Sequence, residues 1–215
     1  MKKSFPRAAC LVFVAILMSP AHATIPDLDH STVEWAYEGS ETLSLMNLPN
    51  GQGFGFDHAF PPGDPVSGPA DAVDATVTLT VIDGLMNPVA NFPFEDLWLE
   101  SQDGGMAFCP GGTVADQDTD AQGRTYFRSP LFAGGSSTTV IGVRVNGDWL
   151  GGRELPLWVN SPDLNGDLRV DLLDIGAFAT GFFGSYVYRI DFNFDGVINL
   201  GDVRYLALGI GAQCP

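Results

Sequence analysis

A stretch of twelve residues occurs twice near the end of the chain, and this duplication constrains the fold more than any other feature. Residues 163–174 (DLNGDLRVDLLD) and residues 191–202 (DFNFDGVINLGD) match position for position at an offset of 28. In each copy, Asp or Asn stands at positions 1, 3, 5, 9 and 12, and an aliphatic residue stands at position 8. This shared spacing predicts that both segments adopt one loop conformation.

The spacing of the oxygen-bearing side chains predicts that each loop wraps a calcium ion. Ca²⁺ takes about six to eight oxygen ligands, and a loop of this length offers side chains at positions 1, 3, 5, 9 and 12 with a backbone carbonyl at position 7. Neither loop contains a nitrogen or sulfur ligand, which argues against zinc and copper. The predicted ligands are Asp163, Asn165, Asp167, Arg169, Asp171 and Asp174, and Asp191, Asn193, Asp195, Val197, Asn199 and Asp202, with Arg169 and Val197 acting through their carbonyl groups.

The two loops differ at position 6, where the chain makes a sharp turn that favours a positive φ angle. Gly196 suits this position in the second loop, because glycine has no Cβ. The first loop has Leu168 there, which costs about 1–2 kcal/mol if it takes the same conformation. The first loop has four carboxylates and the second has three, and the additional negative charge favours calcium binding to the first loop. The sequence leaves open which site binds calcium more tightly.

A short amphipathic helix is predicted after each loop. Apolar residues recur at i, i+3, i+4 and i+7 in both segments, namely Ile175, Phe178, Ala179 and Phe182, and Val203, Leu206, Ala207 and Ile210. No helix is expected to lead into either loop. Pro162 follows the strand-like segment 155–159, and only the six residues 185–190 precede the second loop.

This duplicated loop–helix unit, residues 161–213, resembles the type I dockerin domain. The resemblance implies a fold organised around two Ca²⁺ ions held by the ligands named above. It also implies docking onto a cohesin-like or cell-surface protein, typically in the assembly of extracellular polysaccharide-degrading complexes. Dockerins recognise partners through loop positions 10 and 11, often Ser–Thr, whereas this chain has Leu172-Leu173 and Leu200-Gly201. A calcium module that serves only folding and stability is the alternative.

The region before the repeat is predicted to be β-structure. Alternating apolar residues occur in seven short segments, 32–37, 42–48, 75–83, 94–101, 124–129, 138–146 and 154–159. Val77 and Leu79 are expected to face a core, and the threonines beside them to face solvent, as in a half-buried antiparallel strand. Turn-forming residues lie at 120–124 and 146–148. Seven short strands suggest a β-sandwich.

Residues 74–150 resemble a bacterial Ig-like domain of the invasin or transthyretin-like type, on the segments 76–83, 87–90 and 119–127. The Pro- and Gly-rich stretch 60–74 marks either a long loop or a domain boundary. The expected fold class is mainly β with a small α domain, an Ig-like antiparallel sandwich followed by a duplicated F-hand calcium module. The expected divisions are 1–23, 24–73 (N-terminal strands and a Pro/Gly-rich loop), 74–160 (the Ig-like sandwich) and 161–215 (the dockerin-like domain).

The first of these divisions, residues 1–23, is predicted to be a secretory signal peptide. Three cations precede an uninterrupted apolar run at 8–18, and residues 21–23 (AHA) have the small-x-small pattern of a cleavage site. The run is shorter than the about 20 residues that a membrane span needs, and no second span follows. Cys10 lies near the start of the apolar run and does not end it, which argues against a lipid anchor. We expect a secreted protein that begins at Thr24.

Charge and cysteine content limit the partners and the compartment. The formal net charge is −16, and removal of the signal peptide makes it −19, so nucleic acids and anionic membranes are repelled. Hydrophobic residues make up 45% of the chain, which argues against global disorder. Cys109 and Cys214 remain after cleavage, and an even number in an oxidising compartment favours one disulfide. Two buried free thiols are the alternative.

No catalytic site is predicted, and we expect the chain not to be an enzyme. His30 and His58 lie in no triad-like motif, so a nucleophile lacks a base. Glu95 with Glu100 or Asp96 does not specify a glycosidase pair. A further acidic run, Asp116, Asp118 and Asp120, imitates part of a calcium loop, but Phe127 stands at its position 12, which favours a hairpin loop.

Trp98 is the feature that favours a carbohydrate ligand. It is expected on the same strand face as Asp96 and Glu100, opposite Leu97 and Leu99. A half-exposed Trp beside carboxylates can stack on sugar rings, and a Trp partly covered by a loop is the alternative.

The leading hypothesis from the sequence is an exported, non-catalytic protein that binds calcium through the dockerin-like domain for extracellular attachment or assembly. In a second hypothesis, the sandwich contacts a glycan as a component of polysaccharide degradation. In a third, the protein is purely structural, with the repeat as a calcium-stabilised cap.

Overall fold

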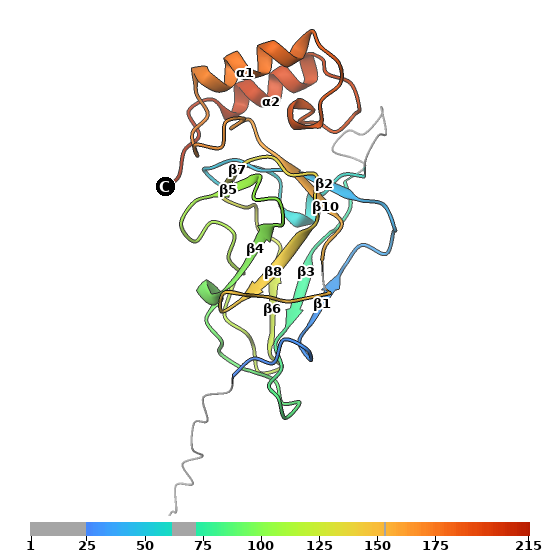
Figure 1. The fold of residues 1–215 in the computed structure, drawn as a ribbon, viewed down its shortest axis with the longest axis vertical. Coiled ribbons are helices and arrows are strands. Elements are labelled where there is room, and N and C mark those ends of the chain that lie inside the picture. Colours follow the sequence, from blue (N-terminus) through green and yellow to red (C-terminus); the bar gives the residue numbers. More distant parts are fainter. Residues whose placement is uncertain (1–24, 62–71, 153) are drawn as a thin grey trace, which may run out of the picture.

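A computed structural model describes residues 25–61, 72–152 and 154–215. The predicted signal peptide and most of the segment 60–74 lie outside the described residues. The described chain is mainly β, with several small sheets and two short helices, which confirms the expected balance of elements (Figure 1). None of its helices has the length and apolar content that crossing a bilayer requires.

The strands are short. They are β1 (Thr32–Trp35), β2 (Leu43–Met46), β3 (Val77–Thr80), β4 (Leu97–Ser101), β5 (Met106–Phe108), β6 (Arg124–Phe127), β7 (Ala133–Gly135), β8 (Ile141–Val145), β9 (Asp148–Trp149) and β10 (Leu157–Asn160). The α-helices are α1 (Leu172–Phe182) and α2 (Leu200–Gly209), and the 3₁₀ turns are η1 (Phe56–His58), η2 (Phe94–Asp96) and η3 (Tyr188–Ile190).

The sheets within the described residues contain two or three strands each. Antiparallel pairing gives the orders β1-β3-β6, β4-β8-β9 and β5-β7. On β3, Val77 and Leu79 are buried while Thr78 and Thr80 are half-buried, as the alternating pattern predicted. Leu97 and Leu99 on β4 are likewise buried, and Trp98 and Glu100 face the opposite side.

The pairing of β2 with β10 differs from the antiparallel pairing that the sequence predicted. These strands lie parallel, with Leu43 opposite Leu157 and Leu45 opposite Val159, and all four side chains are buried. Parallel neighbours need a long connection between them. The chain from β3 to β9 forms most of that connection. The β2–β10 pair therefore joins an early strand to the last strand of the β region, the part of the chain before the repeat.

Two hydrophobic clusters stabilise the molecule. One lies among the sheets and includes Leu79, Leu99, Phe127 and Val143. The second lies beneath α1 and α2, and it combines Phe178, Phe192 and Leu206 of the C-terminal part with Met46, Leu48 and Phe60 of the β region. The two helices pack side by side at one end of the elongated molecule, next to β2, β7 and β10 (Figure 1).

A disulfide joins Cys109, just after β5, to Cys214 near the C-terminus, with their Cα atoms 5.7 Å apart. The predicted bridge is therefore present in the structure. It ties the segment that follows α2 to the paired strands β5 and β7.

Candidate metal centre

The two twelve-residue loops share one backbone conformation. Position 4 has a positive φ in both, 72° at Gly166 and 59° at Phe194. Position 6 does as well, 66° at Leu168 and 78° at Gly196. Leu168 therefore takes the left-handed conformation that the spacing predicted, although it carries a Cβ. The positive φ at Phe194 was not anticipated.

Six hydrogen bonds recur in the two loops at equivalent positions. The Asp at position 12 accepts from the N–H groups of positions 2 and 9, one at each carboxylate oxygen. The Asp at position 1 accepts from the N–H of position 6 through Oδ2. The Asp at position 5 accepts from the N–H of position 7 and from the side-chain amide of the Asn at position 3. The N–H at position 11 donates to the side chain at position 9. The donors are Leu164, Asp171, Leu168, Arg169, Asn165 and Leu173 in the first loop and Phe192, Asn199, Gly196, Val197, Asn193 and Gly201 in the second, over 2.6–3.1 Å.

Each loop passes directly into its helix through a capping box. Asp171 and Asn199 are the N-cap residues, and Asp174 and Asp202 bond back to the N-cap N–H groups. Such reciprocal bonds satisfy N–H groups that have no partner within the helix. The predicted helices are confirmed as α1 and α2, and no α-helix leads into either loop, since β10 precedes the first and η3 precedes the second.

Four carboxylates that bound the loops are buried: Asp163, Asp174, Asp191 and Asp202. Burial, the largest cause, and the charges of Asp174 and Asp167 together raise the pKa of Asp163 to about 6, against the hydrogen bonds that lower it. Burial likewise raises the pKa of Asp202 to about 6, with Asp191 and Asp195 contributing, and it raises the pKa of Asp191. Among the described residues, no Arg or His forms an ion pair with a loop carboxylate.

The second loop also contains buried oxygen atoms that lack a hydrogen-bond partner. Oδ1 of Asp191 and Oδ1 of Asn193, at positions 1 and 3, are both in this state. Buried polar atoms are almost always satisfied in proteins, so such atoms indicate a missing partner. The other carboxylate oxygen of Asp191 accepts a hydrogen bond from the Tyr186 hydroxyl at 3.0 Å. No sequence pattern pointed to Tyr186.

The donor set fits a hard cation. The first loop combines buried and exposed carboxylates, and the second combines buried and half-buried ones. Each loop adds an Asn amide and a main-chain carbonyl, and all of these are oxygen donors of the kind that Ca²⁺ prefers. The described residues contain no compact group of three His, Cys, Asp or Glu side chains. The oxygens are instead distributed along each loop, and in the first loop they are occupied by N–H groups of the loop itself.

Val170, at position 8 of the first loop, bonds through its main chain to the segment after α2. It donates its N–H to the Ala212 carbonyl and accepts a hydrogen bond from the Gly211 N–H. The segment after α2 returns to the first loop, which the short pattern around Val170 did not indicate. Val170 and Ile198 do contribute to the same hydrophobic cluster.

Three leucines at loop positions 10 and 11 are exposed. Leu172 is 81% exposed, Leu173 66% and Leu200 76%. These leucines begin α1 and α2, where the capping boxes fix the first turn of each helix. We call them the leucine surface.

The outer face of the sheet β4-β8-β9 carries a second candidate surface. Trp98 lies opposite Arg144, which in turn lies opposite Trp149. The Arg144 guanidinium stands 3.8 Å from the centre of the Trp149 ring, and its Nε donates to Glu100 at 3.0 Å. A shallow pocket of about 280 Å³ adjoins Trp149. Glu100 is thus engaged by Arg144, and Glu95 lies in the turn η2.

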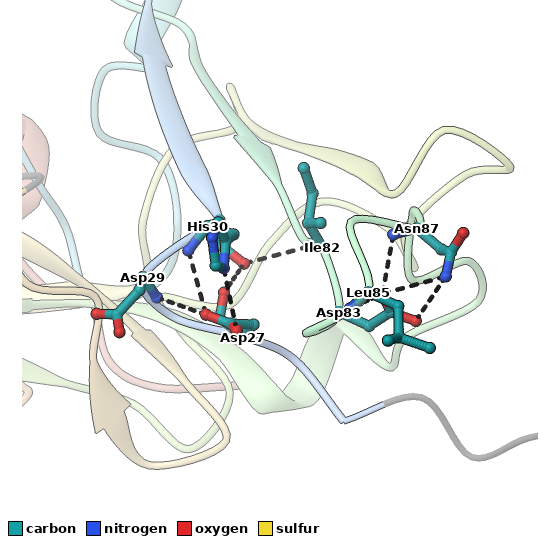
Figure 2. Close-up of polar contacts among 8 residues, drawn as sticks. Asp27, Asp29, His30, Ile82, Asp83, Leu85 and Asn87 are labelled. Carbon is teal, nitrogen blue, oxygen red and sulfur yellow. Dashed lines mark hydrogen bonds and ion pairs between the residues drawn. The ribbon is translucent and has the colours of Figure 1, made fainter.

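The acidic run 116–120 bonds to the main chain. Asp116, Asp118 and Asp120 accept hydrogen bonds from main-chain N–H groups, as expected for a hairpin loop. Figure 2 shows a comparable cluster, in which Asp27 accepts from the N–H groups of Asp29 and His30, and Asp83 accepts from those of Leu85 and Asn87.

Comparisons of the chain with family models, with curated proteins and with solved structures find no match. The paired loops, the leucine surface and the Trp98 face are therefore the features from which a function can be inferred.

Proposed function

We propose that this chain is an exported, non-catalytic calcium-binding protein, in which an Ig-like β-sandwich precedes a dockerin-like module for extracellular attachment or assembly. One observation carries the proposal. Two loops of different sequence share the same six hydrogen bonds, and they hold buried carboxylates that form no ion pair with a cationic side chain of the described residues. A bound divalent cation supplies the missing positive charge.

Ca²⁺ would be held by Asp163, Asn165, Asp167, Arg169, Asp171 and Asp174 in the first site, and by Asp191, Asn193, Asp195, Val197, Asn199 and Asp202 in the second. The main chain of each loop positions these groups through the hydrogen bonds described above. The unpartnered Oδ1 atoms of Asp191 and Asn193 support this assignment in the second loop.

Calcium titration of the full chain, after treatment with a chelator, tests this part of the proposal. We expect two ions per chain by isothermal titration calorimetry, and a rise in the melting temperature. Asp163→Asn and Asp191→Asn should each remove one of the two sites. A chain that binds no calcium, or whose melting temperature is indifferent to it, would contradict the proposal.

The leucine surface supports a docking function. Large exposed apolar side chains at the loop–helix junctions of a protein with a net charge of −16 suit an interaction site. Leucine in place of the Ser–Thr of cellulosomal dockerins favours a partner with an apolar surface in place of a polar one. The Leu172→Asp/Leu200→Asp double variant should retain calcium and lose the partner.

A pull-down from the secreted fraction of the producing organism tests this second part. Capture should occur with wild type in calcium, and should be lost both in chelator and with the double variant. Capture that persists in both conditions would argue against docking through the leucine surface. No calcium-dependent capture at all would leave the repeat as a stabilising cap.

A glycan-binding role is the second candidate, and the Trp98 face favours it. Trp98 and Trp149 flank Arg144 on the outer face of one sheet, beside a pocket that includes Gln102 and Glu154. Aromatic rings beside polar groups suit a sugar ring. A polysaccharide panel with wild type, Trp98→Ala and Trp149→Ala tests it, and retention by wild type that both variants lose would favour this role.

A further inference from the structure

The first residue of the first loop is held by the β region. The Gly135 N–H, in β7, donates to the main-chain oxygen of Asp163 at 2.9 Å. A Cβ built on Gly134 would overlap Oδ2 and Cγ of the Asp163 carboxylate. Gly134 has no positive φ, so its backbone would accept alanine. The carboxylate occupies the space that a side chain at Gly134 would need.

The first residue of the second loop is also held from outside the loop. Asn160, the last residue of β10, is completely buried. Its Nδ2 donates to the main-chain oxygen of Asp191 at 2.7 Å and to that of Tyr188 at 3.1 Å. Asn160 precedes Asp191 by 31 residues, so the contact depends on the tertiary fold.

The hydrophobic core crosses the same boundary. The ring of Phe60 packs against Phe194 of the second loop, with centroids 5.8 Å apart. Trp158 of β10 packs edge-on against Tyr188 at 5.2 Å. The loops and helices therefore share their core with the β region.

We infer that the β region completes both calcium sites, through Gly134 and Asn160, so that calcium affinity depends on the folded β region and calcium in turn stabilises that region. The inference rests on the proposed calcium-binding function. Groups that fix a metal ligand from outside the coordination sphere typically account for about 10- to 100-fold of metal affinity. An ion that binds only the native arrangement stabilises all the structure on which that arrangement depends.

Hydrogen exchange on the unsubstituted full chain tests the reciprocal effect. Exchange is compared by NMR in excess Ca²⁺ and in chelator. We expect the amides of β5 and β7, the Gly135 N–H among them, to exchange about tenfold or more slowly with calcium. Slower exchange confined to residues 161–215 would contradict the inference.

Substitution at Gly134 tests the effect on affinity. Gly134→Ala should weaken one calcium site about tenfold or more, because the added methyl group displaces the Asp163 carboxylate. Gly151→Ala is the matched control, since nothing lies within 4 Å of a Cβ at that position. Calorimetric titration of the full chain gives both affinities, and circular dichroism in chelator reports whether each variant folds.

Asn160→Asp provides the equivalent test at the second site. It keeps the size of the side chain and replaces the amide donor by a carboxylate that faces two carbonyl oxygens. We expect it to weaken the other calcium site, again about tenfold or more. If either variant fails to fold, the exchange comparison on wild type decides.

The possible outcomes separate this inference from the proposed function. Wild type that binds no calcium overturns both. Wild type that binds two ions, with unchanged affinities in folded Gly134→Ala and Asn160→Asp, overturns the inference alone. The inference is supported if each variant weakens a different calcium site while Gly151→Ala binds calcium as wild type does.

Discussion

Individual carboxylates make the loops sensitive to pH when calcium is absent. Burial raises the pKa of Asp163 and of Asp202 to about 6 in the folded chain, against about 3.9 for an unfolded Asp. The folded state therefore binds more protons between these values, and the free energy of unfolding falls as pH rises through this range.

We accordingly predict that the chelated protein is more stable at pH 4.5 than at pH 7, by on the order of 2 kcal/mol. Excess calcium should reverse the trend, because the ion competes with protons for the same oxygens. Urea unfolding at the two pH values, with and without calcium, checks this. Equal stability in chelator at both pH values would count against the burial of these carboxylates.

The backbone at loop position 6 gives a second prediction at this scale. Leu168 has a φ of 66°, which a residue with a Cβ adopts only at a cost in free energy. Gly196 has no Cβ and does not bear this cost. Leu168→Gly should raise the free energy of unfolding by about 0.5–1 kcal/mol, after the added flexibility of the unfolded chain is counted.

The equivalent residue of the second loop offers the reverse experiment. Gly196→Ala should lower stability by about 1 kcal/mol, and nothing lies within 4 Å of the added Cβ, so backbone strain alone is changed. Denaturant unfolding of Leu168→Gly and Gly196→Ala measures both changes in the free energy of unfolding. Changes of the same sign would show that the two loops do not share this conformation.

Among the elements, both α-helices are capped by residues that are also predicted calcium ligands. Asp171 caps α1, and its side chain accepts a hydrogen bond from the Leu173 N–H at 2.8 Å. Asp195, at position 5 of the second loop, caps no helix and is a direct ligand in loops of this type, whereas position 9 often acts through water.

Asp171→Ala and Asp195→Ala should therefore have different effects. Asp171→Ala is expected to lower stability by about 1 kcal/mol with or without calcium, through loss of the cap. Asp195→Ala is expected to weaken its site much more than Asp171→Ala weakens the other. Thermal unfolding in chelator together with calcium titration separates the two effects, and equal losses of affinity would contradict the assigned positions.

The elements that could be predicted from the sequence are those with a repeated or alternating pattern. Each of the seven predicted strand segments contains a strand, and both helices follow their loops. β5, β7 and β9 were missed because two or three residues are too few for an alternation to show. Their positions depend on the partner strand, and β7 contains two glycines that carry no apolar signal.

At the scale of the whole molecule, the contacts between distant segments could not be predicted. The repeat predicted a set of ligands, but nothing in the sequence near Gly134 or Asn160 indicates that they contact Asp163 and Asp191. The parallel pairing of β2 with β10 likewise depends on how the chain closes. A single sequence shows which residues are apolar or charged and does not show which distant residues meet.

The disulfide gives the prediction that belongs to this scale. Cys109 and Cys214 are 105 residues apart, and a bridge over such a loop stabilises by up to about 4–5 kcal/mol when chain entropy dominates. Cys109→Ser/Cys214→Ser, or reduction, should lower the free energy of unfolding by several kcal/mol. Urea unfolding with and without reductant measures this, and two free thiols per denatured, unreduced chain would refute the bridge.

The same bridge governs how the protein would respond to a pulling force. A stretching force between the two ends of the chain passes directly from Cys109 to Cys214 through the covalent bond, and it bypasses the two twelve-residue loops and both helices. The enclosed residues, with a contour length of roughly 350 Å at about 3.4 Å per residue, cannot be drawn out while the bond is intact. A force applied to the two chain ends therefore acts first on the strands before β5.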